Sequence, residues 1–285
     1  MNRDDGAQLD AQYNNRTLVP GHEKIFARWR EASALTRLRA SRRIGLCYGE
    51  GPSETLDLFL SARDGAPVFV FIHGGYWRSM DKAEHSFVAA SFMADGAMVV
   101  VPNYALCPQV TIETIALQMA KTVAWTYRHA ALYGGDPNRI IVGGHSAGGH
   151  LAAMLLCCDW PSVAPDLPPG LVQGAVSISG LFDLEPLSRT PFLKDDLQLT
   201  TESVRRLSPV NFPPPSYGRL MAFVGDEESS EFHRQSALLR QHWGENSVPV
   251  CETVPNTNHF TVLHELANPR SRIHALTCKL MGLEE

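Results

Sequence analysis

The chain has 285 residues, of which 44% are hydrophobic and 19% charged, and its formal net charge is −5. This length can form one large core, so we expect residues 1–285 to be a single domain. The negative charge argues against nucleic acid and anionic membranes as partners. The six cysteines form no Cys-x-x-Cys pair, no apolar run is long enough to span a membrane, and the first residues are polar. These features favour reduced thiols in a cytoplasmic protein.

The first part of the chain is patterned for helices, followed by a hairpin. Apolar residues recur at helical spacing among charged ones between residues 25 and 35. Residues 1–43 are therefore predicted to be a helical N-terminal extension that lies on the domain. Two short apolar stretches, 44–48 and 55–60, are separated by glycine, proline and serine, which predicts a hairpin of antiparallel strands.

From residue 67 onward, strands and helices alternate, which predicts a doubly wound, mostly parallel α/β sheet. The predicted strands are 67–72, 97–101, 140–142, 172–179, 220–224 and 250–254, and the predicted helices are 81–94, 111–132, 147–158, 232–243 and 262–280. Residues 160–170 hold four prolines and are predicted to be a loop. The segment 180–216 is too long for an ordinary connection and is expected to form a small, partial cap over the site.

A serine stands at the apex of a strand–turn–helix stretch. Residues 139–151 begin with a β-branched apolar run, continue as Gly144-x-Ser146-x-Gly148, and end in small and apolar residues that suit a helix. In such a turn a strained backbone projects the serine hydroxyl clear of the sheet, and side chains at the two glycine positions would collide. The stretch therefore predicts a nucleophilic serine.

A second glycine-rich turn follows the buried strand 67–72, in the stretch His73–Gly74–Gly75–Tyr76–Trp77. Ligands of open α/β sheets bind at the carboxyl ends of the strands, where glycines let backbone N–H groups approach closely. An oxyanion formed by attack of Ser146 is expected to meet the N–H of Ala147 and that of Gly74 or Gly75.

A serine needs a base and a carboxylate that orients the base. Of the eleven histidines, His259 lies in a polar loop after the last predicted strand and before the closing helix, where this order of elements places the base. The acid is expected among Asp226, Glu227 and Glu228, which follow the strand 220–224. Glu228 is favoured because the turn has cleared the strand end there, and Asp226 remains the competitor.

Four stretches together resemble the α/β-hydrolase-type kynurenine formamidases (arylformamidases): 73–77, 103–108, 144–150 and 231–236. The His-Gly-Gly triplet is shared with many esterases, whereas its extension to Tyr-Trp together with the Glu-Phe-x-Arg-Gln-Ser stretch is more specific. The resemblance implies an α/β-hydrolase fold and an acid three residues before Glu231, which is Glu228. Animal members usually have aspartate there, so the glutamate is a departure from the pattern.

By this resemblance the protein is expected to be a serine hydrolase that cleaves a small acyl group from N-formyl-L-kynurenine or a similar aryl formamide. The residues implied are Ser146, His259 and Glu228 as catalytic triad, Gly74, Gly75 and Ala147 as oxyanion hole, and His73, Tyr76, Trp77 and His145 as substrate-binding residues. For the two aromatic residues of the glycine turn, packing in the core is an equal alternative to stacking on the substrate.

No cofactor is expected, and no metal, because no His-x-x-x-His or Cys/His ligand spacing was recognised. A small molecule is the expected partner, with neither nucleic acid nor membrane, and a homodimer is allowed for. Two alternatives stay open: a carboxylesterase that acts on small aryl or acyl esters with the same residues, and a non-catalytic binding protein on a hydrolase scaffold. The presence of Ser146, His259 and an acid argues against the second.

Overall fold

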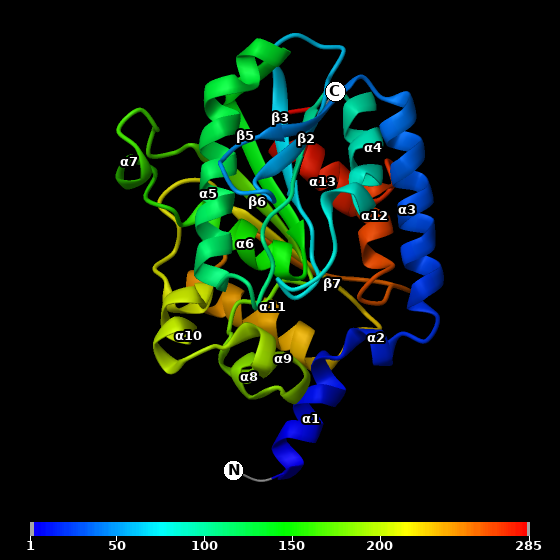
Figure 1. Cartoon of the computed structure of the whole chain (residues 1–285), viewed down its shortest axis with the longest axis vertical. Helices are drawn as coiled ribbons and strands as arrows, with labels where there is room; N and C mark the ends of the chain where they lie inside the picture. Colours follow the sequence, from blue (N-terminus) through cyan, green and yellow to red (C-terminus); the bar gives the residue numbers. More distant parts are fainter. Residues whose placement is uncertain (1–2, 284–285) are drawn as a thin grey trace.

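The structure is a computed structural model that describes residues 3–283 (Figure 1). Over this range, eight strands form one sheet in the order β1-β2-β4-β3-β5-β6-β7-β8. β1 and β2 form the predicted antiparallel hairpin, β2 also runs antiparallel to β4, and every other pair is parallel. The strands are β1 (Arg42–Cys47), β2 (Thr55–Phe59), β3 (Ala66–Ile72), β4 (Met98–Pro102), β5 (Gly135–His145), β6 (Val172–Ile178), β7 (Leu220–Gly225) and β8 (Val250–Val254).

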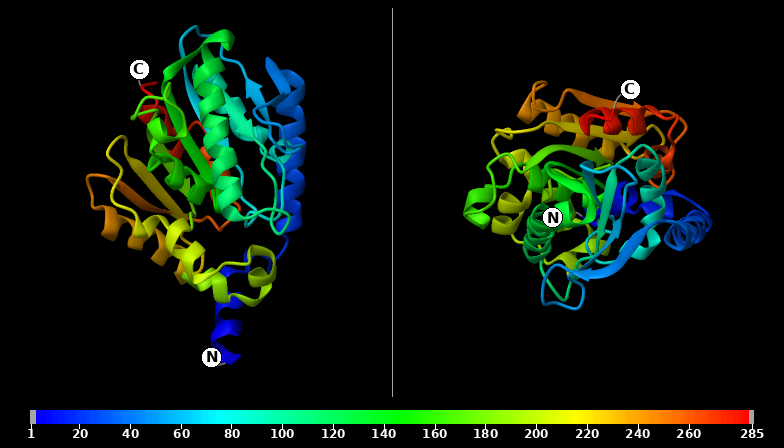
Figure 2. Two further views of the ribbon diagram at one scale, coloured as in Figure 1. Left: turned by 60° about the vertical axis from the view of Figure 1, so that its left-hand side comes forward. Right: turned by 90° about the horizontal axis from the view of Figure 1, so that it is seen from above.

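Helices cover both faces of this sheet (Figure 2). The α-helices are α1 (Arg3–Tyr13), α2 (Asn15–Leu18), α3 (His22–Arg39), α4 (Ala89–Ala94), α5 (Ile112–His129), α6 (Ala147–Leu156), α7 (Trp160–Val163), α8 (Glu185–Arg189), α9 (Pro191–Leu197), α10 (Thr201–Leu207), α11 (Ser230–Trp243), α12 (Val262–Ala267) and α13 (Arg272–Leu280). The 3₁₀ turns are η1 (Lys82–Glu84), η2 (Ser86–Val88), η3 (Ala130–Tyr133) and η4 (Pro209–Asn211).

The sheet separates two hydrophobic cores. One contains the apolar faces of α5, α6 and α11, and the other contains those of α3, α4, α12 and α13. Every residue of β3 is buried, because helices cover both faces of this central strand. The predicted α/β-hydrolase arrangement of a mostly parallel sheet with N-terminal antiparallel strands is thus confirmed. No helix within residues 3–283 combines the length and apolar character that a membrane span requires.

The region 81–94 was wrongly predicted as one helix. It consists of two 3₁₀ turns followed by the short helix α4. The side chain of Asp81 accepts a hydrogen bond from the N–H of Ala83 and begins a tight turn. Lys82 is drawn inward, with its Nζ 2.5 Å from Oδ1 of the buried Asp57. Tertiary contacts of polar residues therefore override the local helical pattern.

The closing helix 262–280 is also interrupted. α12 ends at Ala267 and α13 begins at Arg272, with Pro269 between them. Proline supplies no N–H to a continuing helix, and the Ser271 hydroxyl caps the new one by accepting from the N–H of His274. The predicted loop 160–170 likewise begins with a helical turn, α7.

The N-terminal extension and the segment 180–216 meet beyond the carboxyl ends of the parallel strands. α1 lies beside α8 and α9 there, and α2 follows it (Figures 1 and 2). A side-chain contact joins the two segments, because Asp10 Oδ1 accepts a hydrogen bond from the Phe192 N–H at 3.2 Å. The turns that follow β3, β5, β7 and β8 open toward the same end, so this is where the predicted site residues gather.

Candidate active site

Ser146 lies in a sharp turn between β5 and α6. Its φ of 57° and ψ of −118° are unusual for a residue with a side chain. Its N–H donates to the Ile178 carbonyl at 2.8 Å, which holds the turn in place. A Cβ on Gly144 would lie 2.3 Å from the backbone of Gly148, and one on Gly148 would lie 2.0 Å from the Ile72 carbonyl oxygen. Both positions therefore require glycine.

His259 and Glu228 form a buried pair at 2.6 Å, between Nδ1 of the imidazole and Oε2 of the carboxylate. The carboxylate can only accept, so Nδ1 carries the proton and the Nε2 lone pair is free to act as a base. The other carboxylate oxygen accepts from the Ser179 hydroxyl at 2.5 Å and from the Gly225 N–H at 2.7 Å. Glu228 is thus fixed from both sides and orients the histidine.

Asp226 has a different environment. It is exposed, and its Oδ1 accepts from the Thr257 N–H at 3.0 Å. Hydrogen bonds from the backbone N–H groups of Asn256 and Thr257 lower the pKa of its carboxyl. It therefore braces the loop that carries His259, whereas the contact with the imidazole is made by Glu228.

His145 holds the backbone of His259 in place. Its Nε2–H donates to the His259 carbonyl at 2.6 Å, and the two ring centroids are 4.8 Å apart. Burial, reinforced by the neighbouring His259, holds the pKa of His145 well below its ordinary value, so the ring is neutral. His145 lines the cavity as a predicted substrate-binding residue would, but its Nε2–H is already used to hold the His259 backbone.

The glycine turn after β3 packs against the serine. A Cβ on Gly74 would lie 2.8 Å from the His145 carbonyl oxygen and 3.2 Å from Cβ of Ser146. Gly75 has a φ of 107° and lines the cavity. Ala147 begins α6, so its N–H is one of the first-turn donors that have no partner within the helix. The three predicted oxyanion-hole residues therefore surround Ser146.

Two of the predicted substrate-binding residues lie elsewhere. His73 and Trp77 are fully buried and are not among the described residues that line the cavity. His73 stacks on Tyr104 with ring centroids 4.2 Å apart, and the Tyr104 hydroxyl donates to the carbonyls of His73 and Gly74 at 2.9 and 3.1 Å. Trp77 packs edge-on against His150. Both residues belong to the core that supports the glycine turn, which corrects the expectation of direct substrate contact.

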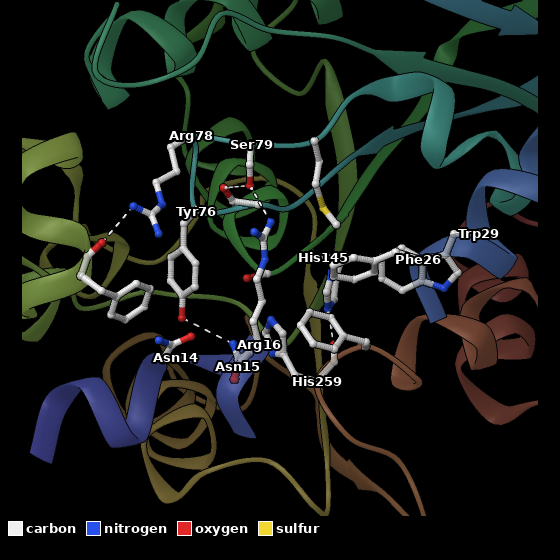
Figure 3. Close-up of a pocket in the computed structure, with 15 residues that line it drawn as sticks. Asn14, Asn15, Arg16, Phe26, Trp29, Tyr76, Arg78, Ser79, His145 and His259 are labelled. Atoms are coloured by element: carbon white, nitrogen blue, oxygen red, sulfur yellow. Dashed lines mark hydrogen bonds between the residues drawn. The ribbon is translucent and has the colours of Figure 1, made fainter. Parts of the chain in front are cut away.

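The cavity has a volume of about 60 Å³, and Ser146 and His259 both line it. Figure 3 shows His259 among the side chains of its wall. Tyr76 also lines it, as predicted, and its hydroxyl donates to the Tyr13 carbonyl at 2.6 Å. Sequence reasoning missed most of the remaining wall: Asn14, Asn15, Arg16, Phe26, Trp29, Arg78, Ser79, Met80, Phe192 and Phe260. Helical spacing predicted an N-terminal extension, but no local pattern indicates which end of the sheet it covers.

Comparison with known proteins shows the family of this chain. Residues 56–160 match the family described as BD-FAE. The kynurenine formamidase of Salmo salar is 30% identical over 264 residues, covering 89% of this chain and 86% of that protein. That of Danio rerio is 30% identical over 243 residues, with coverages of 82% and 80%. This chain belongs to the kynurenine formamidase family. It is therefore a hydrolase of the α/β-hydrolase type.

Solved structures are similar to this formamidase-family fold over nearly its whole length. A protein of Silicibacter sp. TM1040, provisionally described as a thioesterase, is 33% identical with a TM-score of 0.82, covering 94% of this chain and 97% of its own. An esterase of Pyrobaculum calidifontis is 16% identical with a TM-score of 0.67, covering 92% and 93%. At that identity the second likeness bears on the fold alone.

The Glu-Phe-x-Arg-Gln-Ser stretch of this formamidase-family chain lies in the first turns of α11 and begins three residues after Glu228. Glu231 Oε2 accepts from the Tyr13 hydroxyl at 2.6 Å, and Gln235 Nε2 donates to the same hydroxyl at 3.1 Å. Gln235 Oε1 accepts from the N–H groups of Phe182 and Asp183 at 2.7 and 2.8 Å. The stretch thus joins the N-terminal extension and the 180–216 segment to the acid-bearing loop.

One side-chain cluster was overlooked in the sequence. Asp95, His274 and Cys278 place potential metal-ligand atoms within 4.8 Å of one another, and the last two are four residues apart on α13. The spacing His-x-x-x-Cys was therefore present. His274 donates from Nδ1 to the Leu266 carbonyl at 2.8 Å, and its Nε2 lies 2.6 Å from the Asp95 carboxylate. Both ring nitrogens of His274 are therefore already in contact with acceptor groups of the protein.

Proposed function

We propose that this protein removes the formyl group from an aryl formamide such as N-formyl-L-kynurenine, with Ser146, His259 and Glu228 as catalytic triad. The observation that carries the proposal is the buried 2.6 Å contact of His259 with Glu228 beside a cavity that Ser146 also lines. Family membership supports the same chemistry, because the relatives from Salmo salar and Danio rerio are named kynurenine formamidases.

In this mechanism the Ser146 hydroxyl attacks the formyl carbon while Nε2 of His259 takes its proton. Glu228 holds the imidazole in the required tautomer and stabilises its protonated form. The oxyanion receives hydrogen bonds from the N–H of Ala147 and of Gly74 or Gly75, each worth about 10²–10³ in rate. His259 then protonates the departing aryl amine, and water, activated by the same histidine, releases formate from the acyl-enzyme.

The size and lining of the cavity support a small acyl group and an aromatic leaving group. A cavity of about 60 Å³ has room beside Ser146 for a formyl group, the smallest acyl group. Phe26, Tyr76 and Phe192 stand in the wall, where rings can stack on the leaving amine. We further propose that residues 1–285 act as one domain in which residues 1–43 and the partial cap 180–216 complete the cavity.

A carboxylesterase acting on small aryl or acyl esters is the second candidate. Its support is the likeness to esterases: Esterase LipC of Mycobacterium tuberculosis is 31% identical over 163 residues, covering 54% of this chain and 40% of that protein. The same triad serves both substrates, because both reactions pass through a tetrahedral intermediate.

The test compares kcat/KM for N-formyl-L-kynurenine, its N-acetyl counterpart and p-nitrophenyl acetate, each divided by the rate of its hydrolysis by hydroxide. We expect the largest normalised value for the formamide and a marked loss for the acetamide, because the added methyl group enlarges the acyl half. A normalised value that is largest for the ester would favour the carboxylesterase. No measurable turnover of the formamide would exclude the formamidase proposal.

A further inference from the structure

The charged groups that line the candidate active site are unequally partnered. Two arginines and no aspartate or glutamate appear among the described lining residues. Arg78 is neutralised, because it forms an ion pair with Asp196 and donates to the Phe192 carbonyl at 2.9 Å. Arg16 has no carboxylate partner in the described part of the chain. The cavity therefore carries an uncompensated positive charge.

Arg16 lies where it can meet a ligand. It projects from α2, is exposed, and donates to the Ser79 hydroxyl at 3.3 Å (Figure 3). Its guanidinium carbon lies 5.9 Å from the centre of the Phe26 ring. Both contacts are with neutral groups, and the hydrogen bond is long. An anion that forms two parallel hydrogen bonds with the guanidinium would bind it more strongly than the hydroxyl does.

The position of Arg16 places this charge on the leaving-group half of the substrate. The cavity is partly open, and Ser146, where the acyl group reacts, and Arg16 both line it. The larger half of the substrate must therefore extend toward solvent, which is where the exposed Arg16 stands.

We propose that Arg16 binds a carboxylate on the leaving-group half of the substrate and so selects anionic aryl amides or esters over neutral ones. This rests on the proposed function, because it takes Ser146 as the point of acyl transfer. On binding, the guanidinium exchanges the Ser79 hydroxyl for the carboxylate and remains beside Phe26. The N-terminal extension thereby becomes the element that determines substrate specificity.

The experiment measures kcat/KM for pairs of substrates that differ in a carboxylate. 4-Formamidobenzoate and formanilide form one pair, and 4-acetoxybenzoate and phenyl acetate form the other, so that each pair differs only in the carboxylate. Arg16→Gln should lower the ratio of anionic to neutral substrate about 10–100-fold, mainly through a higher KM, and Arg16→Lys should restore part of it. The ratio in the unmodified protein should also fall as salt is added.

Arg63→Gln is the matched control, because it removes the same charge from an exposed arginine that does not line the cavity. It should leave the ratio unchanged. Equal losses on both members of a pair in Arg16→Gln, or no loss, would overturn the proposal. If the protein does not hydrolyse formamides, the ester pair still tests the role of Arg16. Failure of the formamidase proposal and failure of this one can therefore be distinguished. Calorimetry of N-formyl-L-kynurenine binding to Ser146→Ala, with and without Arg16→Gln, needs no turnover and should show a Kd weakened at least tenfold by the second change.

Discussion

Glu228 is held in place by four hydrogen bonds. Its two oxygens contact His259, Ser179 and the Gly225 N–H, and its own N–H donates to the Gly225 carbonyl at 3.2 Å. The side chain is fully shielded from solvent. A carboxylate so constrained can orient an imidazole without paying for the loss of its own rotamer freedom during the reaction. Asp226, two residues earlier, is exposed and bonded to the backbone of the histidine loop.

Glu228→Gln should therefore lower kcat by several orders of magnitude, since the acid of a known triad is worth about 10⁴. Asp226→Asn should change kcat by less than about tenfold, because the amide retains an oxygen that can accept from Thr257. Both substitutions keep size and shape, so neither leaves a cavity. Kinetics on an activated ester, with circular dichroism to verify folding, check this. If Asp226→Asn lowers kcat severely while Glu228→Gln leaves it near normal, Asp226 is the triad acid. If both variants lower kcat only mildly, the acid lies elsewhere in the chain.

At the scale of elements, the N-terminal extension and α11 are joined through one hydroxyl. Tyr13 is fully buried, donates to Glu231 and accepts from Gln235, and its carbonyl accepts from the Tyr76 hydroxyl. α2 follows directly and carries Arg16 to the cavity. The position of the cavity wall therefore depends on this contact.

Tyr13→Phe should loosen α1 and α2 and destabilise their docking by about 1–3 kcal/mol, because Glu231 and Gln235 lose a buried partner. We expect faster hydrogen exchange in residues 3–18 and a higher KM for the best substrate, with a smaller change in kcat. Tyr217→Phe is the control, since its ring is exposed. Unchanged exchange and KM in Tyr13→Phe would show that the hydroxyl does not position the wall.

Local sequence pattern was sufficient for the sheet and for the serine turn. β3 is a continuous apolar run, the second half of β5 contains the buried apolar stretch 140–142, and the two glycines around Ser146 leave few other conformations. Local sequence pattern was insufficient where contacts with distant residues determine the structure. The turns in 81–94 depend on the buried Asp57, and only the direction of the loop after β7 separates Glu228 from Asp226. Contacts made between distant segments leave no local pattern, so the N-terminal wall of the cavity could not be predicted.

The whole molecule contains a group of buried histidines that hold the site and its surroundings together. His73, His85, His145 and His150 are at most 3% exposed. Burial is the main cause that lowers their pKa values, to about 4 for His150 and about 3 for His85. The folded protein therefore keeps them neutral in mildly acidic solution, where the unfolded chain takes up protons.

Stability should consequently fall as the pH drops below about 6.5, because the unfolded state binds more protons than the folded state there. For His150 alone, a folded pKa of about 4 against about 6.5 unfolded contributes a loss of about 2 kcal/mol between pH 7.5 and 5. Urea unfolding at the two pH values measures this. His150→Gln should reduce the pH-dependent loss by about that amount, whereas His242→Gln, at an exposed position, should not. An equal loss in all three proteins would contradict the assignment.

The central claim is that Ser146 is the nucleophile, and the most direct measurement is the turnover of N-formyl-L-kynurenine and an activated ester by Ser146→Ala. The substitution removes one oxygen from a residue that is 2% exposed, so the fold should be retained, with an unchanged circular dichroism spectrum and unfolding midpoint. We predict that kcat falls by about 10⁴-fold or more on both substrates, because the variant lacks the hydroxyl that the proposed mechanism uses to form the acyl-enzyme. Near-normal turnover by folded Ser146→Ala would contradict the account.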